Sequence, residues 1–285
     1  MKSDSAFYIG TTHEVCEDYA VSGDDFIIVS DGCSSSPKTD VGSRIACEVA
    51  VKYNAYKFPK LVLSPLTSKM AGLIGLPDHA MDVTFLSAHI EEEKVIIQMI
   101  GDGNIIIKSK DGTMYVISAE YSRSAPYYIS YMSSPENDKL WDGIPGNFYE
   151  IDYTIMDGGE PRTYKQDMNC SFNEKTFIPN SEFYFGPKMN RIVLDIKDVD
   201  WMALSSDGLR SFYEQIETET SSYSKSVPYL EVVKELFKIK NNNGRFIQRR
   251  LNKFRKACAR KNWHNGDDIS LAVMSMEIEN ATENT

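Results

Sequence analysis

Short apolar segments separated by polar turn residues fill the first third of the chain and predict a strand-rich fold. Residues 5–10 and 26–30 (FIIVS) are short, apolar and rich in β-branched side chains, as strands are. The pattern then becomes helical, because apolar residues recur every three or four positions from Thr39 to Tyr53. Thr39 or Asp40 can cap this helix.

Two hairpins are predicted after this helix. The apolar segments 83–90 and 94–100 are joined by the turn EEEK. The later segment IIIKSKDGTMYVIS carries the pair Asp111-Gly112 between two β-type runs, which is a strong local hairpin signal. Successive hairpins predict antiparallel strands.

Regular patterns return in the last third of the chain. Regular structure is predicted again over 191–205, where WMALSS forms a buried strand that ends at SDG. Residues 228–240 and 244–261 have helical periodicity, and 269–276 form a final strand. This order of elements favours an α+β fold with antiparallel sheets over a doubly wound parallel sheet.

The middle of the chain has a different composition. Residues 121–190 are rich in Tyr, Ser, Asn, Pro and Gly and show little periodicity. We therefore expect a long, irregular insertion with some strand content there, within a single domain that spans residues 1–285.

The balance of charge excludes some classes of function. The chain has 41 acidic and 31 basic residues, for a net charge of −10. Nucleic-acid binding depends on Lys and Arg that neutralise phosphates, so we expect no nucleic-acid partner. The five cysteines form no CxxC pair, and no apolar segment approaches the length of a membrane span. We expect a cytoplasmic protein with no membrane partner.

Acidic residues recur where apolar strands stop or begin, usually with Gly beside them. The junctions and acidic pairs are Asp31-Gly32, Asp102-Gly103, Asp207-Gly208, Glu17-Asp18 and Asp267-Asp268. Each Asp-Gly pair alone is a common turn, because Asp bonds its own backbone and Gly tolerates positive φ. Their repetition favours a second interpretation, in which the carboxylates converge at the ends of the strands.

Converging carboxylates would repel one another unless cations neutralised them. The donors are oxygen atoms, and no His/Cys cluster has zinc spacing, which favours Mg²⁺ or Mn²⁺. Two such ions about 3.5–4 Å apart can activate a water and bind a phosphoryl oxygen during in-line attack. The sequences GxGxxG and GxxxxGK[ST] are absent, which disfavours dinucleotide and P-loop chemistry.

The order of these motifs resembles the type 2C family of metal-dependent protein serine/threonine phosphatases, especially its bacterial branch. The resemblance extends from His13 to Met276. It rests on CED at 16–18, DGCSSSPKTDVGSRIA at 31–46, DVTFLSAHI at 82–90, IGDG at 100–103, SSDGL at 205–209 and GDDIS at 266–270.

The resemblance implies a central β-sandwich of two antiparallel sheets flanked by α-helices, with two cations in a cleft at one end. Asp31 would bridge the two Mg²⁺ or Mn²⁺ ions, and the carbonyl of Gly32 would bind one of them. The segment 121–190 matches the place of a mobile flap near the substrate.

The resemblance also implies the remaining ligands. Asp207 and Asp267 would bind one metal, and Asp18 would act at the other, directly or through water. Asp102 matches a position tied to a weaker third ion, although the Asp that often accompanies it is Ser211 here.

Two departures from the family concern the phosphoryl group. The phosphate-binding Arg of the family is replaced by His13, which could bind phosphate when protonated or be an ordinary surface residue. A His proposed as general acid in some members is replaced by Cys33, which has no basic neighbour in the sequence to activate it.

The main hypothesis from the sequence is hydrolysis of phosphoserine and phosphothreonine in proteins, opposing a Ser/Thr kinase. A water or hydroxide activated by two metal ions would attack phosphorus directly, without a phosphoenzyme. The loss of the phosphate-binding Arg leaves open a pseudophosphatase that binds phosphoproteins with little turnover. A hydrolase of small phosphomonoesters is a third alternative.

One strongly basic segment has no place in this hypothesis. Residues 244–261, GRFIQRRLNKFRKACARK, could form a docking surface for an acidic partner or a phosphopeptide. Alternatively, the charges solvate the outer face of a helix whose apolar residues face the core.

Overall fold

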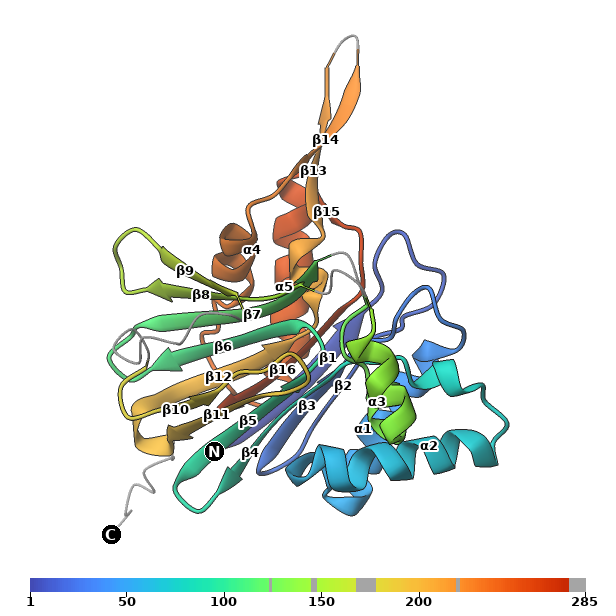
Figure 1. Ribbon diagram of the computed structural model, residues 1–285. Helices are drawn as coiled ribbons and strands as arrows, with labels where there is room; N and C mark the ends of the chain where they lie inside the picture. Colours follow the sequence, from blue (N-terminus) through green and yellow to red (C-terminus); the bar gives the residue numbers. More distant parts are fainter. Residues whose placement is uncertain (123–124, 145–147, 168–177, 219–220, 277–285) are drawn as a thin grey trace.

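Two antiparallel sheets pack face to face in the computed structural model of the chain, which describes residues 1–122, 125–144, 148–167, 178–218 and 221–276 (Figure 1). One sheet has seven strands and the other has six. Every pair of neighbouring strands in both sheets is antiparallel.

The strands of the two sheets come from distant parts of the chain. In spatial order, the seven-stranded sheet contains β1 (Lys2–Tyr8), β16 (Ile269–Ser275), β12 (Val199–Ser205), β6 (Gly103–Ser109), β7 (Met114–Ser122), β8 (Phe148–Met156) and β9 (Arg162–Asp167). The six-stranded sheet contains β10 (Glu182–Tyr184), β11 (Asn190–Asp195), β5 (Lys94–Ile100), β4 (Phe85–Glu91), β3 (Phe26–Ser30) and β2 (Tyr19–Ser22).

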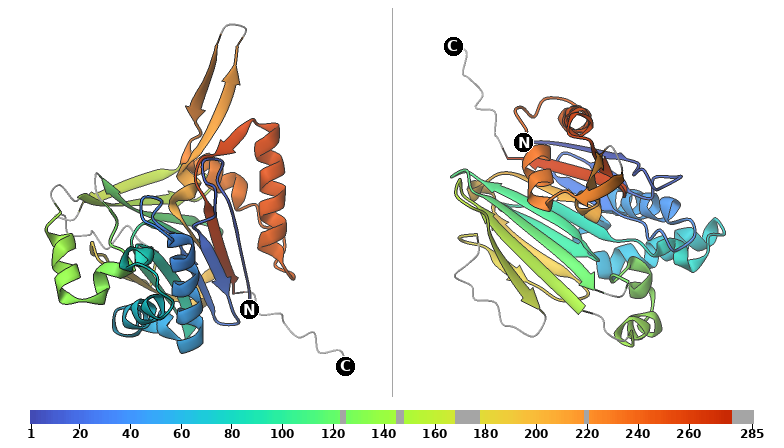
Figure 2. Two further views of the ribbon diagram at one scale, coloured as in Figure 1. Left: turned by 90° about the vertical axis from the view of Figure 1, so that its right-hand side faces the viewer. Right: turned by 90° about the horizontal axis from the view of Figure 1, so that it is seen from above.

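A third, smaller sheet forms an arm that extends from the body of the molecule (Figures 1 and 2). Its strands are β14 (Ser222–Ser226), β13 (Phe212–Glu217) and β15 (Trp263–Asn265). The base of the arm follows Asp207 in the chain and precedes Asp267.

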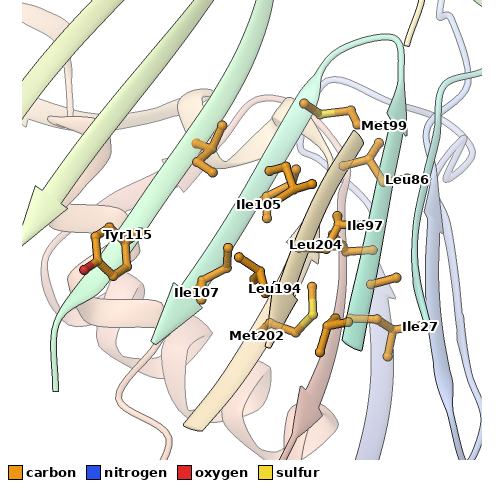
Figure 3. Close-up of a cluster of buried hydrophobic side chains, with 14 of the residues drawn as sticks. Ile27, Leu86, Ile97, Met99, Ile105, Ile107, Tyr115, Leu194, Met202 and Leu204 are labelled. Carbon is orange, nitrogen blue, oxygen red and sulfur yellow. The ribbon is translucent and has the colours of Figure 1, made fainter. Parts of the chain in front are cut away.

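Alternate residues of each central strand face opposite layers, because successive side chains of a strand point to opposite faces. In β3, Ile27 and Val29 face the other sheet, whereas Ile28 faces the helices outside. In β6, Ile105 faces the other sheet and Ile106 faces the helices on its own side. Figure 3 shows side chains of both sheets meeting in the central layer.

Helices cover the outer faces of both sheets (Figure 2). α1 (Thr39–Tyr53), α2 (Ser64–Leu73) and α3 (Pro135–Asp142) contribute to the apolar cluster outside the six-stranded sheet. α4 (Tyr229–Leu236) and α5 (Phe246–Arg260) contribute to the cluster outside the seven-stranded sheet. The layers confirm the predicted α+β sandwich. Among the described residues, no helix has the length and apolar character needed to cross a bilayer.

The predicted strand WMALSS belongs to β12 up to Ser205, and a 3₁₀ turn at Ile196–Asp198 separates β12 from β11. The helix predicted over 228–240 ends at Leu236, where Nε of Arg250 donates to the carbonyl of Leu236 at 2.6 Å.

Residues 121–190, where the sequence predicts irregular structure, contribute regular strands as well as loops. β7, β8 and β9 pair in continuous register and lengthen the seven-stranded sheet. The aromatic rings of Tyr127 and Trp141 meet edge to face, with centroids 5.1 Å apart. Both are buried with Ile129 against the six-stranded sheet, so this part of the chain builds its own extension of the core.

Two helical glycines offer a matched test of the packing. A Cβ at Gly42 of α1 would lie 1.7 Å from the carbonyl oxygen of Ala80, whereas a Cβ at Gly72 of α2 would meet nothing within 4 Å. Gly42→Ala should lower the free energy of unfolding by about 1–3 kcal/mol through overpacking. Gly72→Ala should raise it by up to about 1 kcal/mol through helix propensity. Urea unfolding followed by circular dichroism measures both, and equal effects would contradict the packing described.

Candidate metal centre

Four aspartates reach one place from the ends of strands in both sheets. Asp31 follows β3 and Asp102 follows β5 in the six-stranded sheet. Asp207 follows β12 in the seven-stranded sheet, and Asp18 lies directly before β2. The centre therefore lies at one end of the sandwich, as the sequence predicts.

Asp31 is the central member of the group. The carboxyl group of Asp31 lies close enough to those of Asp18 and Asp207 for each pair to shift one another's pKa. The charges of Asp18, Asp207 and Asp102 all act on Asp31. The charge of Asp207 also reaches Asp267, which opens the final strand. All five carboxylates predicted from the sequence are thus brought together.

Burial and mutual repulsion raise the pKa of every carboxyl group in the cluster. Burial is the largest cause for Asp18, whose pKa rises to about 7. Burial and then the charge of Asp207 raise the pKa of Asp267 to about 6. Burial and neighbouring carboxylates raise the pKa of Asp31 and Asp102 well above the ordinary range, and burial raises that of Asp207. Without a cation, the cluster therefore retains protons.

Close backbone packing fixes the two segments that carry Asp207 and Asp267. A Cβ at Gly208 would lie 1.8 Å from the carbonyl oxygen of Asp268, so no larger residue fits between them. On the other side of the site, Gly32 is buried and forms a bridge with Val83. Each of these glycines directly follows an aspartate of the cluster. The Asp-Gly pattern in the sequence therefore reflects close backbone packing as well as a turn.

Hydroxyl groups hold the cluster in place, and sequence reasoning missed them. Oγ of Ser206 donates to Oδ2 of Asp18 at 2.6 Å and accepts from the amide of Ser270 at 3.1 Å. Oγ1 of Thr84 accepts from the amide of Asp31 at 3.1 Å. The sequence could have indicated both residues by their positions. Ser206 directly precedes Asp207, and Thr84 belongs to the motif DVTF.

Asp82 ties the loop after Asp31 to the segment 121–190. Its carboxylate accepts from Oγ of Ser36 at 2.7 Å and from Oγ of Ser130 at 2.5 Å. The amide of Ile129 donates to the carbonyl of Val83 at 3.1 Å, so the segment lies beside this loop. The sequence motif DVTF contained Asp82, but the sequence alone assigned it no role.

Asp268, the second residue of the acidic pair, organises the N-terminal loop. It is buried, and its carboxylate accepts from the amides of Gly10 at 2.7 Å and Glu17 at 2.6 Å. Nδ1 of His13 lies 3.1 Å from Oδ2 of Asp268. This residue therefore joins the start of the chain to the segment that carries Asp267.

His13 faces carboxylates on both sides of its ring. Nε2 lies 3.3 Å from Oδ1 of Asp267, and Nδ1 lies 3.6 Å from Oε2 of Glu17. Burial lowers the pKa of His13, but the charges of Asp268, Asp267 and Glu17 outweigh burial and raise it.

The donor set fits hard divalent cations. Asp18 is 1% exposed, and its Oδ1 has no hydrogen-bond partner among the described residues. An oxygen atom buried without a donor, beside other carboxylates, is suited to a cation. The cluster offers carboxylate oxygens without Cys or His ligands at its centre, which suits Mg²⁺ or Mn²⁺ better than zinc.

Comparison with known proteins gives a family and a shared fold. The sequence profile described as Protein phosphatase 2C matches residues 10–255. A bacterial serine phosphatase carrying an Arg-to-Ala substitution is 11% identical, with a TM-score of 0.53 over 97% of this chain and 99% of that chain. No curated protein matches the sequence.

Two further solved structures have a similar fold. The serine/threonine phosphatase Stp1 from Staphylococcus aureus is 12% identical, with a TM-score of 0.50 over 98% of this chain and 96% of that chain. The serine/threonine phosphatase PstP from Mycobacterium tuberculosis is 10% identical, with a TM-score of 0.50 over 97% and 99%. Because these structures are only 10–12% identical to the chain, they establish the fold alone. The family is established by the profile match, which covers residues 10–255.

The raised pKa values predict how stability of the metal-free protein depends on pH. A carboxyl with a raised pKa binds more protons when folded than when unfolded, so stability falls as pH rises through the window between the two values. With Asp18 at about 7 and Asp267 at about 6, we expect the melting temperature to fall between pH 5 and pH 8.

The expected fall is several degrees, since one pKa unit corresponds to about 1.4 kcal/mol and a chain of this size shifts by about 2–4 °C per kcal/mol. Differential scanning fluorimetry in EDTA measures it. Mn²⁺ at pH 8 should restore the melting temperature, and Asp31→Asn should weaken both effects. A metal-free protein that is more stable at pH 8 than at pH 5 would contradict the assignment.

Proposed function

Because the chain belongs to the protein phosphatase 2C family, whose members are metal-dependent protein serine/threonine phosphatases, we propose that it hydrolyses phosphoserine and phosphothreonine at a two-metal centre. The observation that carries the proposal is the convergence of the carboxyl groups of Asp18, Asp31 and Asp207, which raises the pKa of Asp31 well above its ordinary value. A module that bound no metal would gain nothing from this costly arrangement. The substrates would be phosphoproteins made by a Ser/Thr kinase.

Each residue of the centre has a proposed role. Asp31 would bridge two Mg²⁺ or Mn²⁺ ions, and the carbonyl of Gly32 would bind one of them. Asp207 and Asp267 would hold one ion, and Asp18 would act at the other. When bound, the two ions supply an activated water and neutralise charge on the phosphoryl oxygens.

The chain's own side chains complete the site around the phosphoryl group. Asp102, whose pKa responds to Asp207 and Asp267, would hold a weaker third ion. Ser206 and Thr84 keep the carboxylate of Asp18 and the backbone of Asp31 in position. His13 would hold Asp267 in position, since its Nε2 lies 3.3 Å from Oδ1 of that residue.

One observation favours a second candidate function, a phosphoprotein-binding module with little turnover. Both ring nitrogens of His13 face carboxylates, so the residue at the family's phosphate-binding position is already engaged. The rate of hydrolysis therefore has to be measured directly. Phosphopeptides and small phosphomonoesters should be compared as substrates in the same experiment.

Asp31→Asn tests the metal centre. The change should reduce Mn²⁺-dependent hydrolysis of phosphothreonine peptides by at least about 100-fold, because a charge that organises the reacting centre is lost. Asp24→Asn is a matched control, because Asp24 is exposed in the turn between β2 and β3. EDTA should abolish activity of both the wild type and the control.

The outcomes separate the candidate functions. Turnover that survives EDTA would defeat the metal-dependent mechanism. A folded wild type that binds Mn²⁺ and the phosphopeptide without hydrolysing it would favour the binding module. Faster hydrolysis of small phosphomonoesters than of any phosphopeptide would favour the third alternative.

His13→Gln tests what the histidine does. If His13 positions Asp267, the concentration of Mn²⁺ needed for half-maximal activity should rise several-fold, with little change in KM for the phosphopeptide. If His13 instead contacts the phosphoryl group, KM should rise and the metal requirement should stay the same. Initial rates over a matrix of metal and peptide concentrations distinguish the two.

A further inference from the structure

Positive charge is segregated in this acidic protein. Residues 238–261 contain ten of the chain's 31 Lys and Arg residues and no Asp or Glu. The rest of the chain then has 21 basic against 41 acidic residues. Such segregation creates a local positive potential on a molecule that is negative elsewhere.

The structure gathers half of these cations around one pocket. It lies between the segment after α4 and the first two turns of α5, and its volume is about 220 Å³. Residues of α5 at helical spacing form one wall, and residues of the connecting segment form the other. The lining residues are Lys238, Ile239, Lys240, Asn241, Phe246, Arg249, Arg250 and Lys253.

Two of the five cations already have partners. Arg250 is nearly buried and donates to the carbonyls of Glu235 and Leu236 at the end of α4, which fixes the pocket wall. Nζ of Lys238 lies 2.8 Å from Oε2 of Glu235. One carboxylate therefore neutralises this side of the pocket.

The other three cations have no carboxylate partner among the described residues. Lys240, Arg249 and Lys253 are exposed, and Arg249 donates only to the oxygen atoms of Asn241 and Asn243. Like charges held together destabilise a fold unless something neutralises them. An anionic partner would remove this repulsion.

The pocket is separate from the metal centre. It is built on the first turns of α5, and a rise of 1.5 Å per residue puts the far end of this 15-residue helix about 20 Å away. The far end leads into β15 and then to Asp267. A molecule in the pocket would therefore bind without blocking the carboxylate cluster.

We propose that this pocket, lined by Lys240, Arg249 and Lys253, docks an acidic segment of a partner protein. The partly buried side chain of Ile239 adds a surface for an apolar residue within such a segment. A nucleic acid fits less well, because its extended charge would meet the strongly acidic remainder of the molecule. The apolar residues of α5 face the core, as the solvated-face alternative expects, and the pocket beside them is what favours docking in addition.

The proposal is tested by binding alone, so its failure is distinguishable from failure of the phosphatase activity. The probe is a fluorescein-labelled peptide of about 12 residues, rich in Glu with one central Leu, in fluorescence anisotropy with the full chain. The variant is Lys240→Glu with Lys253→Glu. The matched control is Lys69→Glu with Lys110→Glu, which makes the same change of net charge at exposed lysines in α2 and in the β6–β7 turn.

The pocket variant should bind at least tenfold more weakly than the wild type, while the control stays within about twofold. Binding of the wild type should also weaken with salt, because its charges are exposed. Lys240→Gln with Lys253→Gln gives a milder version should the charge reversal unfold the protein. Absence of binding, equal losses in pocket and control variants, or preference for a DNA duplex over the peptide would each overturn the proposal.

Discussion

Mutual repulsion among the carboxylates at the end of the sandwich is the constraint on which the rest of the site depends. Asp31 lies beside Asp18 and Asp207. Asp18 is buried and the other two are partly buried, and burial is the largest cause that raises the pKa of each. Such a cluster is stable only when protons or cations neutralise it. The hydroxyl of Ser206, the amides that bind Asp268 and the imidazole of His13 offset part of this cost without removing the need for a cation.

The sandwich supplies the rigidity that such a cluster requires. Strands of both sheets end at the same place, so ligands from residues 18 to 267 are fixed by backbone pairing rather than by flexible loops. The contact between Gly208 and the carbonyl of Asp268 shows how closely the segments approach. A central layer of interdigitating apolar side chains between the sheets resists any spreading of these strand ends.

Local patterns predicted much of this structure because they report short-range physics. Alternating apolar residues and Asp-Gly turns located β3, the hairpins and the acidic strand ends. The sequence did not predict the arm of β13 and β14, whose exposed, polar strands lack an apolar alternation. It also missed Asp82 and Asp268, because their partners are distant in the sequence and only the folded chain brings them into contact.

The fold places its acidic residues and its basic residues in different parts of the molecule. The fold concentrates carboxylates at one end of the sandwich and cations on the helix outside the seven-stranded sheet. The carboxylates can be neutralised by small ions, whereas Lys240, Arg249 and Lys253 line a pocket of about 220 Å³. A flexible acidic chain can bring several carboxylates to these three residues. A protein substrate that carried such a chain would be held near the enzyme while its phosphorylated residue entered the site, and the link would raise its effective concentration there.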